Sequence, residues 1–193
     1  MNKLKVVALL VLTQLGGCIS YSHHDLAQVQ QWPPVVPAIA HAKPRVYVSL
    51  VAEHQMNGVP EAGGIDQARW EKVLVDNYSD SGLFSQVTTQ QVDSDVYVQA
   101  RLINQEQGSY AMSFITGFTL FLVPSDFDNV LTLETVYKNG DGKVLGTVRK
   151  SETITTWMQT LLIVAVPFNK GFDPTIKQLV QSSLEEAQQR KLI

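Results

Sequence analysis

The stretch NVLTLETVYKNGDGKVLGTVRKSETIT, residues 129–155, predicts a long β-hairpin around which the rest of the fold is arranged. Its centre, Asn139-Gly140-Asp141-Gly142, contains residue types that accept the positive φ angles of tight hairpin turns. We therefore expect one strand over residues 129–137 and its antiparallel partner over residues 144–155.

Strands and helices are predicted on both sides of this hairpin. Residues 46–51 are β-branched and aromatic, and residues 94–102 alternate between apolar and polar side chains, so each range predicts a strand. Between them, residues 66–80 have the apolar spacing of a helix, with Asp66 as its N-cap. A closing helix is expected from Asp173-Pro174, because Asp favours the N-cap and Pro favours the first helical position.

The element order is therefore β-α-(β)-β-β-β-α, which predicts a single α+β domain over residues 45–193. The expected fold class is an antiparallel sheet of about four to five strands with two helices packed on one face. Residues 18–44 are proline-rich, which disfavours a regular helix or a central strand. They predict a tether ahead of the domain. The alternative is a segment draped on the domain surface through Trp32 and Val35-Val36.

The N-terminus has the pattern of a secretory signal. Lys3 and Lys5 give it a basic start, residues 6–12 are apolar, and small residues precede the chain's single cysteine in Leu15-Gly16-Gly17-Cys18. The apolar run is too short to span a bilayer, which needs about 20 residues. The last four residues resemble the lipobox of bacterial lipoproteins, in which an aliphatic residue and two small residues precede an invariant cysteine.

The resemblance implies that residues 1–17 are a signal peptide and that Cys18 becomes the N-terminus, with a diacylglycerol on its sulfur and an N-acyl chain. Several acyl chains anchor a protein stably, whereas one chain binds only marginally. Because Ile19 rather than Asp follows the cysteine, the family's sorting rule implies the periplasmic face of the outer membrane. The alternative is an ordinary secretory signal that leaves a free thiol, although no second cysteine exists to pair with it.

Two apolar segments interrupt the predicted sheet: YAMSFITGFTLFLVP, residues 110–124, and WMQTLLIVAVPF, residues 157–168. Neither contains a charged residue, and each is too short to span a membrane as a helix. In an up-and-down sheet both should emerge next to each other, at the end opposite the Asn139-Gly140 turn. They either form ordinary core or expose an apolar surface that docks on the bilayer, a lipid cargo or a partner protein. The expected contact residues are Phe114, Phe118, Phe121, Trp157, Leu162 and Phe168.

Residues suited to catalysis or metal binding are few. His23, His24 and His41 lie in the predicted tether, and the sequence has no nucleophile elbow, zinc-protease helix or phosphate loop. Asp126 and Asp128 predict a solvated turn rather than a calcium loop. The net charge is −3 and the Lys and Arg residues are scattered, so no basic patch for nucleic acid is expected. We therefore predict no enzyme activity, metal or cofactor apart from the lipid on Cys18.

The order of elements over residues 45–190 resembles periplasmic accessory lipoproteins, such as auxiliary subunits of lipid-transport systems and the curli-secretion and Tol-associated proteins. The resemblance implies a non-catalytic, lipid-anchored binding or accessory subunit in outer-membrane assembly or transport, with an envelope protein or lipid as partner. One alternative is a structural or surface lipoprotein. The other is a periplasmic enzyme acting on glycan or lipid, which would need Glu53, His54 and Glu61 to meet in one cleft.

Overall fold

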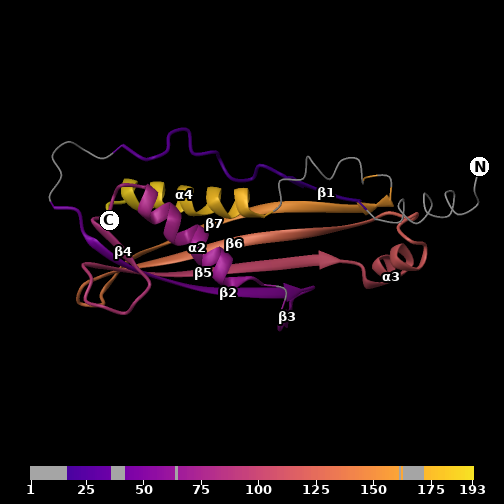
Figure 1. Cartoon of the computed structure of the whole chain (residues 1–193), viewed down its shortest axis with the longest axis horizontal. Coiled ribbons are helices and arrows are strands. Elements are labelled where there is room, and N and C mark those ends of the chain that lie inside the picture. Colours follow the sequence, from indigo (N-terminus) through magenta and orange to yellow (C-terminus); the bar gives the residue numbers. More distant parts are fainter. Residues whose placement is uncertain (1–16, 36–41, 64, 161, 163–171) are drawn as a thin grey trace, which may run out of the picture.

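The computed structural model describes residues 17–35, 42–63, 65–160, 162 and 172–193. Within them the chain forms one seven-stranded sheet in the order β1-β7-β6-β5-β2-β3, with β4 paired to β2 (Figure 1). The strands are β1 Gly17–Ser22, β2 Arg45–Met56, β3 Val59–Glu61, β4 Gln86–Thr88, β5 Val96–Gly108, β6 Ser125–Asn139 and β7 Val144–Gln159. The helices described are α2 Gln67–Asp80, α3 Tyr110–Phe118 and α4 Asp173–Gln189.

The predicted hairpin is confirmed as β6 and β7, which pair antiparallel from Ser125–Met158 to Lys138–Val144. Asn139 closes its turn. The backbone amide of Asn139 donates to the carbonyl of Lys143 at 2.9 Å, and its side-chain oxygen accepts the amide of Lys143 at 2.8 Å. Gly142 has a φ of +81°, which glycine adopts without strain. Local turn chemistry therefore sets the register of the two longest strands.

The predicted fold class is wrong, because the sheet is mixed rather than antiparallel and has more strands than expected. β2 runs parallel to β5 from Val46–Val96 to Met56–Glu106, and it also runs parallel to β4. The physical reason is α2, which returns the chain to the end where β2 began, so that β5 runs in the same direction as β2. The unpredicted elements are β1, β3 and α3.

α2 and α4 cover the same face of the sheet, and the core lies beneath them (Figure 1). Side chains buried there include Leu74 and Tyr78 of α2, Leu179 and Leu184 of α4, and Val48, Val98, Leu133 and Val148 of the sheet. The hydroxyl groups of Tyr78 and Tyr137 lie 3.1 Å apart in this core. Burial holds the pKa of Tyr78 well above its ordinary value of 10.0, and the contact with Tyr137 adds to the rise. The pair is therefore uncharged at neutral pH.

The N-terminal segment, residues 17–35, packs on the domain instead of forming a free tether. β1 pairs antiparallel with β7 from Gly17–Gln159 to Ser22–Ile154. Beyond β1, Leu26 is buried in the core and Trp32 packs against it. Of the residues named for the draped alternative, Trp32 packs against the core, Val35 is exposed, and Val36 lies outside the described residues. Apart from Gly17, the predicted signal peptide lies outside the described residues.

Candidate functional site

The first apolar segment forms α3, a short helix at the end of the sheet opposite the Asn139-Gly140 turn (Figure 1). Ser109 caps its N-terminus by accepting the amide of Met112 at 3.3 Å. At its other end, the hydroxyl of Thr119 donates to the carbonyl of Ile115 at 2.8 Å. Short-range capping therefore defines both ends of this helix.

The chain leaves α3 through two consecutive residues in the left-handed region, Leu120 with a φ of 53° and Phe121 with a φ of 62°. Residues with side chains adopt this region only where the surroundings hold them there. The hydroxyl of Thr160 donates to the carbonyl of Leu120 at 2.8 Å, and its amide donates to the carbonyl of Phe121 at 3.0 Å. Because Thr160 belongs to the second apolar segment, the two segments are neighbours, as predicted.

The apical segment, which we define as residues 110–122, is largely exposed. Phe114, Phe118 and Leu122 have exposed fractions of 74%, 80% and 72%. The rings of Phe114 and Phe118 stack with their centroids 6.3 Å apart. Thr116 is the one buried residue of α3. Of the two alternatives for this segment, the structure therefore shows an apolar surface and not ordinary core.

The other predicted contact residues differ in exposure. Phe121 and Leu162 are half-buried, and Trp157 of β7 is 40% exposed. Phe168 lies outside the described residues. Further exposed residues of the apical segment were not predicted as contacts: Tyr110, Met112, Ile115, Leu120 and Leu122. Their membership of the same uncharged run is the signal that could have identified them.

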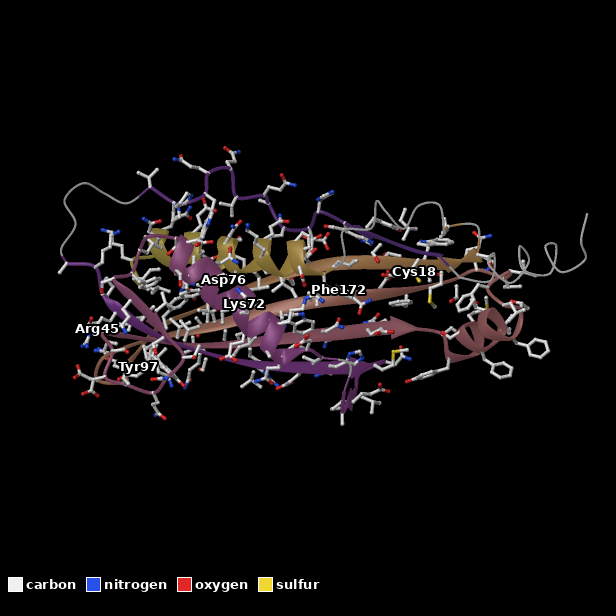
Figure 2. All side chains as sticks on the ribbon, in the orientation of Figure 1. Cys18, Arg45, Lys72, Asp76, Tyr97 and Phe172 are labelled. Carbon is white, nitrogen blue, oxygen red and sulfur yellow. The ribbon has the colours of Figure 1, made fainter. Side chains whose placement is uncertain are left out.

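Cys18 lies in β1, toward the same end of the molecule as α3 (Figures 1 and 2). In the sheet register Cys18 is opposite Met158 of β7, and Met158 is opposite Ser125, the first residue of β6. Adjacent strands are about 4.8 Å apart, so the Cα atoms of Cys18 and Ser125 are separated by about 10 Å. Ser125 directly follows the loop after α3. The predicted lipid attachment site and the apical segment therefore share one end of the sheet.

A buried carboxylate holds the residues after Cys18 against the sheet. Glu152 of β7 is 1% exposed and accepts a hydrogen bond from the hydroxyl of Ser22 at 2.5 Å. It also accepts the backbone amides of Asp25 at 3.3 Å and Leu26 at 2.7 Å. Hydrogen bonds to an ionised acceptor are about twice as strong as neutral ones. Glu152 therefore holds residues 22–26 against the sheet and fixes the direction in which the N-terminal segment leaves β1.

The residues named for the enzyme alternative, Glu53, His54 and Glu61, line a cavity of about 340 Å³ beside β2 and β3. His54 is opposite Glu61 in the register, and its Nε2 lies 3.7 Å from the carboxylate of Glu106. Arg101 binds Glu53 through two hydrogen bonds of 2.8 and 2.7 Å, and this contact holds the pKa of Glu53 below its ordinary value. The three residues therefore meet in one cavity, as the enzyme alternative requires, and the described residues of its lining include no Ser, Thr, Cys or Lys beside His54.

Asp126 and Asp128 belong to β6 and not to a separate turn. The carboxylate of Asp128 accepts the hydroxyl of Thr155, whose oxygen lies 2.7 Å from Nε2 of His23. In the part of the chain that the structure describes, no three His, Cys, Asp or Glu side chains are grouped closely enough to hold a metal ion. Among the same residues, no helix has both the length and the apolar character needed to cross a bilayer.

Comparisons with known proteins give distant similarities to solved structures and no match in sequence. No family model and no curated protein matches the chain. Among solved structures, the chain is similar to PelC from Paraburkholderia phytofirmans, which was solved as a dodecamer. The two sequences are 11% identical, the alignment covers 88% of this chain and 96% of the PelC chain, and the TM-score is 0.37. So distant a similarity assigns no function to this chain.

Proposed function

We propose that this protein is a lipid-anchored, non-catalytic accessory protein of the bacterial envelope, held at the periplasmic face of the outer membrane by acyl chains on Cys18. The observation that best supports the proposal is the position of Cys18 at the start of a paired strand. Cleavage after Gly17 would remove one residue of β1 and its pairing with Gln159, and would leave the rest of the strand in place. The lipidated residue would then be fixed at the end of the sheet where the apical segment is exposed.

In this arrangement the anchor also sets the orientation of the domain. β1 is paired up to Ser22, and Glu152 holds the residues that follow. The anchored end of the sheet therefore faces the membrane, and the Asn139-Gly140 turn points away from it. Strands rise about 3.3 Å per residue, so β6, with 15 residues, extends about 50 Å away from that end. This distance would present the far end of the domain to partners in the periplasm.

The contacts of three acidic side chains are relevant to the proposed binding role. Glu53 pairs with Arg101, Asp128 accepts from Thr155, and Glu152 holds the N-terminal segment. Asp128 and Glu152 are thus engaged in hydrogen bonds within the fold, whereas Glu53, although paired with Arg101, shares a cavity with His54 and Glu61. We propose a protein or a lipid of the outer-membrane assembly or transport machinery as the partner.

The proposal is tested by Cys18→Ser in the full-length chain, expressed in a Gram-negative host. We expect the wild type to gain the mass of a diacylglycerol and an N-acyl chain and to fractionate with the outer membrane. The serine variant should gain neither, because it lacks the thiol that forms the thioether. Mass spectrometry of the N-terminal peptide and fractionation of the membranes are the measurements.

Ile19→Asp is the matched control. By the sorting rule of the lipoprotein family, this variant should gain the same mass as the wild type but remain in the inner membrane. A wild-type N-terminus without any added mass would overturn the proposal, and so would an equal added mass on the Cys18→Ser variant.

A further inference from the structure

We infer that the apical segment inserts into the interface of a phospholipid bilayer and forms a second, non-covalent attachment beside the lipid on Cys18. The inference rests on the proposed function for the identity of the membrane. Insertion of the apical segment does not require the lipid, so insertion and lipidation can be tested separately. The packing, the charge and the position of the apical segment support its insertion.

The domain gives α3 little support. The helix has nine residues and buries Thr116 alone, and isolated helices shorter than about 12 residues are marginal in water. Apart from Ser113, Thr116 and the hydroxyl of Tyr110, the residues of α3 are apolar, and a helix with so much apolar surface normally lies in a core or in a membrane. The exposed residues of α3 include both Phe114 and Ile115, which are neighbours in sequence and therefore face different sides of the helix. α3 thus requires a second apolar surface that the described part of this chain does not supply.

The apical segment can leave water at a small electrostatic cost. No Asp, Glu, Lys or Arg occurs between Glu106 and Asp126. Backbone polar groups must be satisfied before they enter a bilayer. At the exit of α3, the amide of Phe121 donates to Thr116 at 2.7 Å, and the carbonyl of Phe121 accepts from Thr160. Because the segment contains no cation, attraction to anionic lipid contributes nothing, and its binding should be insensitive to salt.

The dimensions of the segment suit shallow insertion. A nine-residue helix rises about 14 Å, which is less than half of the roughly 30 Å hydrocarbon thickness. Phe114 and Phe118 form one apolar face, and Tyr110 at the base of the helix carries a hydroxyl that suits the headgroup level. The left-handed pair Leu120 and Phe121 then turns the chain back toward β6. The segment would therefore occupy one leaflet.

The position of Cys18 favours the bilayer over a soluble partner as the occupant of this surface. The Cα atom of Cys18 is about 10 Å from that of Ser125, so the acyl chains would enter the membrane beside the apical segment. Once the anchor is inserted, the segment meets the same bilayer in an intramolecular step, which adds to the affinity that the apical segment has by itself.

The test uses the mature chain, residues 18–193, with Cys18→Ser, so that no lipid is attached. We expect this protein to float with vesicles of phosphatidylcholine, and to do so equally at about 0.1 M and about 1 M salt. Phe114→Asp combined with Phe118→Asp should lower the vesicle partition coefficient at least about a hundredfold, because burial of each phenylalanine side chain contributes about tenfold or more. Thermal unfolding checks that this variant, altered at two exposed positions, still folds.

Val144→Asp combined with Leu145→Asp is the matched control, because these two apolar residues are exposed at the opposite end of the sheet. This control should bind vesicles as well as the parent. The inference is overturned if the parent stays in solution, or if the phenylalanine variant binds equally well. It is also overturned if the parent self-associates through the apical segment, seen as a dimer that the phenylalanine variant abolishes. A failure of the lipid anchor would appear only in the mass of the Cys18 peptide.

Discussion

Glu152→Ala is expected to detach the N-terminal segment from the sheet and to lower the free energy of unfolding by about 3 kcal/mol. The carboxylate accepts one hydroxyl and two backbone amides, and hydrogen bonds to charged groups contribute about 1.5–3 kcal/mol each. Once released, these donors are hydrated again, so the loss is smaller than the sum of the three bonds. The burial of Leu26 would be lost together with them.

Denaturant unfolding and amide hydrogen exchange measure the two parts of this prediction. The amides of residues 20–26 should exchange rapidly in the variant, while those of β5 and β6 remain protected. Glu152→Gln keeps one acceptor oxygen and should have a smaller effect, and Ser151→Ala, at an exposed neighbouring position, should have almost none. Unchanged protection of residues 20–26 in Glu152→Ala would show that other contacts hold the segment.

Leu179→Ala should have a comparable or larger effect on stability, with a loss of about 2–5 kcal/mol. Leu179 is fully buried on the side of α4 that faces the sheet. The alanine would leave a cavity in the core, and the well-packed neighbours could collapse into it only partly.

Thermal and denaturant unfolding of Leu179→Ala test whether α4 and the sheet share one core. Lys177→Ala is exposed on the same helix and is the matched control, with an expected change within about 0.5 kcal/mol. A loss below about 1 kcal/mol for Leu179→Ala would mean that α4 contributes little to the core.

The sequence was most informative where the structure depends on short-range chemistry. The hairpin turn at Asn139-Gly140-Asp141-Gly142 and the strands beside it follow from local φ preferences and alternation. The cap at Asp66 follows in the same way, because its side chain accepts the amide of Arg69. The parallel pairing of β2 with β5 was missed, although a strand, a helix and another strand in succession is the usual arrangement of a parallel pair.

The packing of the N-terminal segment depends on contacts that one sequence does not reveal. The prolines of the segment favour a tether. The hydrogen bond that holds the segment joins Leu26 to Glu152, which lies 126 positions further along the chain. One signal was available in β7, where Glu152 alternates with the inward-facing Val148 and Ile154 and is therefore a charge directed at the interior. A buried carboxylate requires donors, and the donors here come from Ser22, Asp25 and Leu26 in the predicted tether.

The sequence predicted where the apical segment lies in the fold, but not whether its side chains are buried or exposed. Chain direction alone placed residues 110–124 at the end opposite the hairpin turn. Whether they were core or surface depended on what packs against them, and the structure shows that α3 buries Thr116 alone. The same structure places Cys18 at that end, so the proposed lipid anchor and the exposed aromatic residues would face in the same direction.

The most direct test of this account is the depth of two probes in the lipidated protein reconstituted in bilayers. Cys18 is the only cysteine and its sulfur would carry the lipid, so Phe118→Cys and Leu145→Cys each offer one reactive thiol for an environment-sensitive fluorophore. We predict that lipids with quenchers on their acyl chains quench the probe at position 118 and leave the probe at position 145 unaffected. A probe at position 118 that is as water-exposed and unquenched as the one at position 145 would contradict the proposed orientation.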